Sequence, residues 1–278
     1  MFNVGKFKCC LHTTWLAQEF IYLNKVDSTN TYLKNWSKER LCHGTLCLAD
    51  QQSAGRGQYK RTWISEPFSN LTFTISFQPT HNLSPHVLNL ACAAAIADTA
   101  KHYTGLKASV KWPNDVICNG NGKKLAGLLS ESIYSGTHCD QVLIGIGLNV
   151  NQISFDKGLS EKATSLAQLD TNTGEEFDRE TVLAWLLSRI EYYYQLYCKN
   201  PLKLLKKINR QIIGYGEWRY VNTLNTDKEP ERCKILGINE QGYLLALNSS
   251  HEIRTFTYEQ IRILQPDYHG SRYHRASS

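Results

Sequence analysis

Hydrophobic and polar positions follow regular periods along the first two-thirds of the chain. Between residues 71 and 77 large apolar side chains alternate with threonine and serine, which predicts a strand with one buried face. Apolar residues over 178–198 recur at the spacing of one helix face, and a proline suited to a first helical turn opens a second predicted helix over 84–103. The other predicted elements are a helix over 29–36, with the Ser28 side-chain oxygen as its N-cap, and strands over 45–49, 110–112, 124–133 and 141–150.

The pattern changes after a helical segment at residues 202–211. Four short strand-like runs follow, and glycines separate them. This spacing is typical of a small β-barrel of about 50 residues. We therefore expect a mixed helix and strand domain first and a small β domain second. The expected divisions are a short N-terminal extension at 1–21, a main domain at 22–211, a β-barrel at 212–265 and a disordered polar tail at 266–278.

Composition excludes several classes of protein. The longest apolar run, residues 90–97, is far shorter than the ~20 residues that cross a bilayer, and the mean hydropathy is -0.39. Nine cysteines, an odd number without a C-x-x-C pair, argue against a disulfide or zinc framework. No segment directs the chain to secretion, so a cytoplasmic protein without membrane contact is expected.

The net charge of +6 is partly concentrated in one predicted helix, at residues 199–210. Lysines and arginines on such a helix more often form a solvated face than a nucleic-acid footprint. DNA binding is therefore not expected from the charge pattern.

The segment 51–63 carries the strongest local signal for ligand chemistry. Gly55 and Gly57 flank Arg56, so the backbone can approach an anion closely beside a positive charge. Two further cations and an aromatic face follow: Lys60, Arg61 and Trp63. The segment lacks the G-K-[ST] of a P-loop and the third glycine of the dinucleotide fingerprint. Alone, such a loop is more often a solvated turn.

Two later segments place polar groups at strand ends. Residues 111–115 end a predicted strand with a proline and then present an amide and a carboxylate, and a pair of lysines follows at 123–124. Residues 145–151 end another apolar strand with two glycines and two asparagines, where a ligand can meet backbone. Singly, each pattern is also typical of ordinary turns.

In their order along the chain, five segments resemble the biotin–protein ligase family: 27–30, 52–57, 111–115, 124–127 and 145–149. The resemblance implies an α+β fold, with a class II synthetase-like catalytic domain of mixed sheet and helices followed by a small SH3-like β-barrel. It also implies an activity that needs ATP and Mg²⁺. Biotin becomes biotinyl-5'-AMP with release of pyrophosphate, and is then passed to a lysine of the carrier protein of a biotin-dependent carboxylase.

The same resemblance implies roles for individual residues. Lys124 matches the catalytic lysine, whose ammonium can bridge the biotin carboxylate and the α-phosphate, with Arg56 beside them. Asp115 either positions metal or takes a proton from the incoming lysine amine, and the sequence leaves that choice open. The expected biotin-binding residues are Ser28, Thr29, Asn30, Gln52, Gly55, Arg56, Gly57, Lys124 and Gly127. The expected nucleotide-binding residues are Gln58, Lys60, Arg61, Trp63, Lys111, Asn114 and Asn149.

The chain departs from the family pattern at two places. Gln58 stands where many relatives carry a second arginine, which predicts a weaker anion clamp. Only about 21 residues precede the expected catalytic domain, fewer than a helix-turn-helix needs, so repressor function is not expected. Lipoate stays the alternative substrate, and a non-catalytic biotin or nucleotide binder is the alternative class. A homodimer through a sheet edge stays open.

Overall fold

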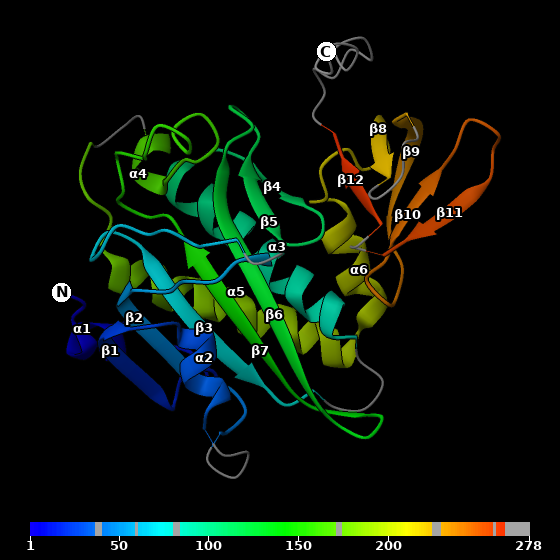
Figure 1. Ribbon diagram of the computed structural model, residues 1–278. Helices are drawn as coiled ribbons and strands as arrows, with labels where there is room; N and C mark the ends of the chain where they lie inside the picture. Colours follow the sequence, from blue (N-terminus) through cyan, green and yellow to red (C-terminus); the bar gives the residue numbers. More distant parts are fainter. Residues whose placement is uncertain are drawn as a thin grey trace.

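The computed structural model describes residues 1–36, 41–58, 61–79, 84–170, 174–223, 229–257 and 260–264. Within these ranges seven strands form a mixed sheet (Figure 1). The first two strands are parallel and every other neighbouring pair is antiparallel. In spatial order the strands are β1 (Phe20–Val26), β2 (Leu46–Gln52), β3 (Leu71–Phe77), β7 (His138–Leu148), β6 (Lys124–Ser135), β5 (Asp115–Cys118) and β4 (Ala108–Lys111).

Two long helices cover one face of this sheet, as Figure 1 shows. They are α3 (Pro85–Thr104) and α5 (Arg179–Lys199), and both match the helices predicted from periodicity. Proline occupies the first turn of α3, and Gly105 ends the helix in the left-handed conformation at φ 70°. The alanines at 93–95 are completely buried, so α3 and the sheet can approach closely. The short helix α2 (Thr29–Lys34) lies on the opposite face.

The burial of β3 differs from its prediction. All seven residues are buried, so the expectation of a single buried face was wrong. The helix layer covers one face, while α2 and its neighbouring loops cover the polar one. The polar side chains on that face are hydrogen-bonded instead of solvated. Thr72 donates to the carbonyl of Ala49 at 2.8 Å, and Ser76 accepts from Gln141 at 2.8 Å.

A buried charge cluster ties the N-terminus to the helix layer. Arg179 of α5 lies 2.9 Å from Asp50 of β2, and the side chains are 7% and 0% exposed. The other Asp50 oxygen accepts from the backbone N–H of Phe2 at 3.3 Å and from the Tyr22 hydroxyl. Burial and the Asp50 hydrogen bond raise the pKa of Tyr22 to about 12, so the phenol stays a donor. Next to Phe2, α1 (Val4–Cys10) packs against α5.

A second, antiparallel sheet follows α6 (Pro201–Asn209), and it fits the expected SH3-like module (Figure 1). Asn209 accepts from the backbone N–H of Ile238 at 2.8 Å, and Trp112 donates to the carbonyl of Gly242 at 3.0 Å. These bonds join the two sheets through α6 and the end of β4. In spatial order the strands are β11 (Ile253–Phe256), β10 (Leu244–Leu247), β9 (Glu231–Ile238), β8 (Trp218–Thr223) and β12 (Ile261–Ile263).

The α+β architecture is therefore confirmed, while the proposed division at residue 212 stays a prediction. The expected tail at 266–278 lies outside the described residues. Several short elements were not predicted: α1, β1, β5, α4 (Leu166–Leu169) and β12. No described helix combines the length and apolarity needed to cross a bilayer.

Candidate active site

Beyond the end of β2, the glycine-arginine-glycine segment at 55–57 pairs antiparallel with residues 61–63, and these two paired arms are called the hairpin. Trp63 donates its backbone N–H to the carbonyl of Gly55 at 2.9 Å, and Gly57 donates to Arg61 at 2.7 Å. A Cβ on Gly55 would lie 2.5 Å from the carbonyl oxygen of Trp63, so no larger residue fits there. The close approach that requires this glycine is therefore to the returning arm of its own hairpin.

This hairpin closes a pocket of about 60 Å³ over the open face of the seven-stranded sheet. Its walls come from α2, the hairpin, β3, β6 and β7. The predicted site residues that line it are Ser28, Thr29, Asn30, Gln52, Arg56, Gly57, Gln58, Trp63, Asn114, Lys124 and Gly127. Five segments that are far apart in the sequence thus meet at one cavity.

The remaining predicted site residues lie around this lining. Asp115 reaches it through Lys124, and Gly55 lies behind it against Gln52. Asn149 is buried and donates its side chain to the carbonyl of Thr164 at 2.9 Å, which fixes the following loop. Lys111 and Arg61 do not line the pocket, and Lys60 lies outside the described residues.

Ser28 differs from its sequence prediction. It occupies the N-cap position of α2, yet its hydroxyl makes no capping hydrogen bond. Its backbone N–H donates to the Asp27 carboxylate at 2.6 Å. The expectation that the serine oxygen caps the helix was wrong, and its side chain lies at the pocket instead.

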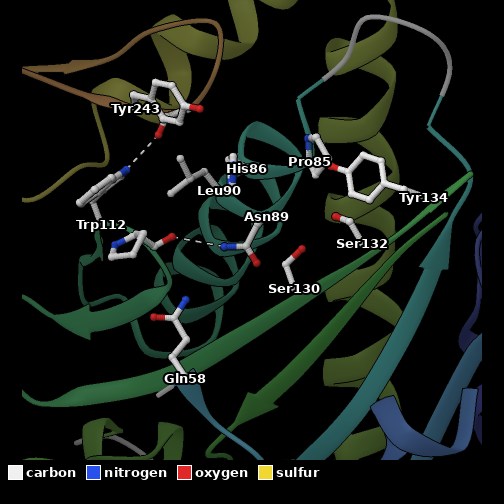
Figure 2. A pocket seen from close by; sticks show the side chains of 12 residues that line it. Gln58, Pro85, His86, Asn89, Leu90, Trp112, Ser130, Ser132, Tyr134 and Tyr243 are labelled. Atoms are coloured by element: carbon white, nitrogen blue, oxygen red, sulfur yellow. Dashed lines mark hydrogen bonds between the residues drawn. The ribbon is translucent and has the colours of Figure 1, made fainter. Parts of the chain in front are cut away.

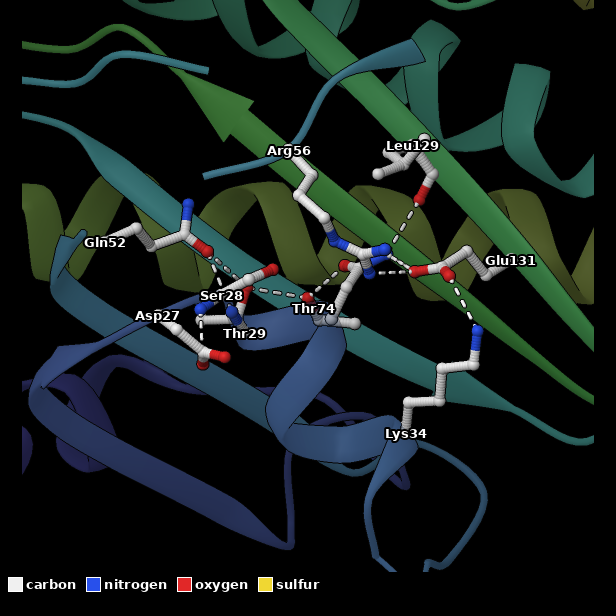
Figure 3. Close-up of polar contacts among 10 residues, drawn as sticks. Asp27, Ser28, Thr29, Lys34, Gln52, Arg56, Thr74, Leu129 and Glu131 are labelled. Atoms are coloured by element: carbon white, nitrogen blue, oxygen red, sulfur yellow. Dashed lines mark hydrogen bonds and ion pairs between the residues drawn. The ribbon is translucent and has the colours of Figure 1, made fainter. Parts of the chain in front are cut away.

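A chain of neutral hydrogen bonds crosses the pocket (Figure 3). Thr29 donates its backbone N–H to the Gln52 side-chain oxygen at 2.8 Å, and its hydroxyl lies 3.1 Å from the same oxygen. The Thr74 hydroxyl lies 2.8 Å from that of Thr29 and 2.6 Å from the Asn30 side-chain oxygen. Asn30 in turn donates to Glu131 at 3.0 Å. Such a chain suits a ligand that carries both donors and acceptors.

The Glu131 carboxylate ends this hydrogen-bond chain and contacts two cationic side chains. Its carboxylate lies 2.6 Å from the Arg56 guanidinium and 3.0 Å from the Lys34 ammonium. Burial raises the pKa of Glu131, but the hydrogen bonds from Asn30 and Lys34 and the charge of Arg56 outweigh it. The pKa therefore lies below its ordinary value, and the carboxylate is ionised at neutral pH.

Lys124 begins β6 on the other side of the pocket. Its ammonium lies 2.7 Å from the Asp115 carboxylate and 5.5 Å from the ring centre of Trp63. The backbone is fixed as well, because Lys124 donates its N–H to the carbonyl of Lys162 at 2.7 Å. A Cβ on Gly127 would lie 2.9 Å from the Lys124 ammonium, so the glycine leaves the space that this side chain uses.

Two glycines of β7 form the floor of the pocket. A Cβ on Gly145 would lie 2.1 Å from the Asn30 side-chain oxygen, and one on Gly147 would lie 2.2 Å from the Trp63 ring. The indole N–H of Trp63 is buried and has no hydrogen-bond partner among the described residues. A buried donor without a partner is costly unless a ligand or water satisfies it.

A second cavity of about 320 Å³ adjoins the first and shares Gln58 with it (Figure 2). One wall is α3, where Asn89 donates to the carbonyl of Pro113 at 3.2 Å. Trp112 and the turn at 242–243 of the second sheet form the opposite wall. The C-terminal sheet therefore reaches the surroundings of the candidate site.

Sequence reasoning did not find Thr74 and Glu131. Thr74 lies between apolar residues of β3, Glu131 lies between two serines of β6, and strand parity was the available signal. Thr74 alternates with the apolar residues of β3, while Glu131 shares one face of β6 with Gly127 and Leu129.

Comparison with known proteins agrees with this geometry. Residues 22–149 match the Biotin/lipoate A/B protein ligase family. The bifunctional ligase/repressor BirA of Bacillus spizizenii is 34% identical over 242 residues, which cover 84% of this chain and 71% of that protein. The biotin–[acetyl-CoA-carboxylase] ligase of Paracoccus denitrificans is 33% identical over 164 residues, which cover 58% of this chain and 67% of the relative.

A solved structure has the same fold over nearly the whole described chain. The biotin protein ligase from Aquifex aeolicus in complex with biotin and ATP superimposes with a TM-score of 0.73 at 29% identity. The match covers 89% of this chain and 99% of that one. Family match, relatives and fold agree with the five segments gathered at the pocket, and the chain therefore belongs to the biotin/lipoate A/B protein ligase family and is a ligase.

Proposed function

We propose that this ligase activates biotin with ATP to biotinyl-5'-AMP, releases pyrophosphate, and transfers biotin to a lysine of the carrier protein of a biotin-dependent carboxylase. One observation carries the proposal. Three members of the neutral hydrogen-bond chain (Thr29, Asn30 and Gln52), the Arg56 side chain and the Lys124 side chain line the same cavity. Biotin offers a neutral ureido ring and a carboxylate, and ATP offers the phosphate that the carboxylate attacks.

The neutral side of the pocket suits the ureido ring. Thr29, Asn30 and Gln52 offer amides and a hydroxyl, with Ser28 beside them. A buried amide-like ring binds well only where its donors and acceptors all find partners. The Arg56 guanidinium at the pocket edge is placed to receive the carboxylate at the other end of the ligand.

Lys124 is placed for the activation step. As the biotin carboxylate attacks the α-phosphate, negative charge gathers on the phosphorus oxygens, and an ammonium held at the pocket stabilises it. The Asp115 carboxylate lies 2.7 Å from that ammonium. When Lys124 turns to the phosphate, the released carboxylate can accept the proton of the acceptor amine in the second step. Closure of the hairpin over the adenylate excludes water.

The described residues fit Mg²⁺ only as an ion carried by the nucleotide. No group of three or more histidine, cysteine or acidic side chains converges anywhere in the described ranges. Mg²⁺ on nucleotides is usually held by phosphates, water and one or two carboxylates. Asp115 is the carboxylate at hand, and bound Mg²⁺ would neutralise phosphate charge beside it. The proposed nucleotide contacts are Gln58, Lys60, Arg61, Trp63, Lys111, Asn114 and Asn149.

The test is biotin transfer to a recombinant carrier domain, followed by intact mass. We expect a biotin-sized mass gain that requires ATP and Mg²⁺. The Lys124→Ala variant should lower the rate by about 10²–10³-fold, the usual cost of removing one group that stabilises transition-state charge. Lys123→Ala is the matched control, because the neighbouring side chain donates to the carbonyl of Ser160 away from the pocket.

Parallel reactions separate the alternatives. A mass gain with lipoate alone would replace the proposal by lipoate transfer. Absence of a gain with either acid, while biotin still binds, would leave a binding protein. Equal rates in the Lys124→Ala and Lys123→Ala variants would remove Lys124 from the chemistry.

A further inference from the structure

Glu131 takes part in three contacts that none of the predicted roles uses. One carboxylate oxygen accepts from the Lys34 ammonium at 3.0 Å. The other accepts from the Asn30 side-chain amide at 3.0 Å and from Arg56 at 2.6 Å. Glu131 is 18% exposed, so its charge faces these three side chains more than water. It is therefore the common end point of the neutral chain and of the arginine.

An ionised carboxylate accepts hydrogen bonds and donates none, which determines the orientation of the Asn30 amide. The NH₂ group of Asn30 must face Glu131, and it also donates to the carbonyl of Leu129 at 3.3 Å, so its oxygen faces Thr74. Gly145 packs directly against that amide, because a Cβ there would lie 2.1 Å from the Asn30 oxygen. Hydrogen bonds thus decide which end of the amide faces Glu131, and close packing against Gly145 holds the side chain in place.

The direction of the remaining bonds follows from proton counting. Thr74 has one hydroxyl proton, and the Asn30 oxygen can only accept, so the bond of 2.6 Å uses that proton. Thr74 can then only accept from Thr29. The Gln52 oxygen already accepts the Thr29 backbone N–H at 2.8 Å, so the Gln52 NH₂ group turns away from Thr29 (Figure 3). Gln52 thereby presents donors, which suit a ligand carbonyl.

We propose that Glu131 is a positioning residue that sets the direction of the hydrogen-bond chain from Asn30 through Thr74 to the Thr29 hydroxyl. It thereby fixes the donor and acceptor pattern that recognises the ureido ring. This inference rests on the proposed function and deepens it. Glu131 touches no substrate atom in this scheme. The same carboxylate holds Arg56 at the pocket edge until a ligand carboxylate competes for it.

The first test is the Glu131→Gln variant, assayed for steady-state activation of biotin. Glutamine has the same shape but can donate as well as accept, so only the longer bond to the Leu129 carbonyl, at 3.3 Å, still fixes the orientation of Asn30. We expect the KM for biotin to rise at least tenfold, with the KM for ATP within twofold and the native circular dichroism spectrum retained. A bond to a charged group is of the right strength for this change. An unchanged KM for biotin would overturn the inference.

The second test distinguishes direction from mere packing. In the Asn30→Asp/Glu131→Gln double variant the carboxylate moves from position 131 to position 30, the next member of the hydrogen-bond chain. Thr74 again faces a group that only accepts, namely the carboxylate introduced at position 30. The glutamine introduced at position 131 donates its amide to the same carboxylate. We expect the KM for biotin to return to within about threefold of wild type. A double variant no better than Glu131→Gln alone would contradict the proton-direction argument.

Lys34→Gln is the matched control. It removes one cation from Glu131 but no bond of the chain, and Lys34 is 51% exposed, so the KM for biotin should stay within twofold. Wild-type protein measured in parallel separates the two levels of inference. If wild type neither binds nor activates biotin, the proposed function fails. If wild type is active and Glu131→Gln has the same KM for biotin, only the role of Glu131 fails.

Discussion

Two arginine–carboxylate pairs of similar geometry lie in very different surroundings. Asp50 and Arg179 are 2.9 Å apart between β2 and α5, and both are almost completely buried. Glu131 and Arg56 are 2.6 Å apart between β6 and the hairpin, and Arg56 is 42% exposed. The first pair joins two regular elements. The second joins a strand to a loop that can change its partner.

The difference shows how the same chemistry serves stability in one place and exchange in another. The Arg179 guanidinium is buried beside Asp50, so no water can replace the carboxylate if the pair separates. The two side chains therefore stay paired in the folded protein. Arg56 is solvated and Glu131 keeps Lys34 and Asn30, so Arg56 can move to a ligand carboxylate at small cost.

The largest expected effect comes from breaking the buried Asp50–Arg179 pair. Asp50→Asn leaves the Arg179 charge buried without a counter-ion, which should lower the free energy of unfolding by about 3–5 kcal/mol. Urea unfolding followed by circular dichroism measures this change. The exposed Asp156→Asn is the control, with a change within about 0.5 kcal/mol. Equal stability of the two variants would remove the distinction between the pairs.

Breaking the more exposed Glu131–Arg56 pair should lower biotin affinity and leave the stability of the fold nearly unchanged. For Arg56→Gln we expect the free energy of unfolding to change by less than about 1 kcal/mol, because the arginine side chain is 42% exposed. Biotin affinity should fall about 10- to 100-fold through loss of a charged hydrogen bond to the carboxylate. Calorimetric titration with biotin measures it. A large loss of stability with unchanged affinity would reverse the comparison.

Acid should affect the Glu131 carboxylate in a defined direction. The native pKa of Glu131 lies below its ordinary value of 4.5, so its ionised form stabilises the fold. That contribution is complete above about pH 4.5 and is lost as the pH falls through the lower native pKa. The difference in unfolding free energy between wild type and Glu131→Gln should therefore shrink from pH 6 to pH 3. A difference that stays constant over this range would contradict the assignment.

The smallest expected effect concerns Gln58, which lines both cavities. Gln58→Arg adds one cation to the hairpin, and an exposed charge is worth about 0.2–1 kcal/mol. Escape of the adenylate from the enzyme should slow by up to about fivefold, as measured by release of labelled intermediate after rapid dilution. Gln58→Asn is the control for side-chain replacement without charge. Unchanged escape in the arginine variant would show that position 58 does not restrain the intermediate.

Sequence patterns predicted the long elements well because periodicity accumulates with length. The helices α3 and α5 match their predictions to within one or two residues. The four-residue strand β5 carries too little pattern to detect. For β3, alternation gave the correct strand but the wrong burial, since a polar face can be covered by another element and hydrogen-bonded there.

The candidate site divides in the same way. Contiguous motifs identified most residues that line the pocket, although their individual roles stay predictions. Glu131 and Thr74 were not predicted because their roles depend on contacts with Asn30, which lies 101 and 44 positions away in the chain. Ser28 was misjudged as a cap, since local sequence cannot show that its hydroxyl leaves the cap unfilled.

The bare floor of the pocket limits how this enzyme could be redesigned for bulkier substrates. Gly145 and Gly147 already carry no side chain, and the space above them is taken by Asn30 and the Trp63 ring. Mutation cannot deepen the cavity there, because nothing smaller than glycine exists. Libraries that seek to admit larger biotin analogues should therefore vary the walls, such as Phe73, and keep the two glycines constant.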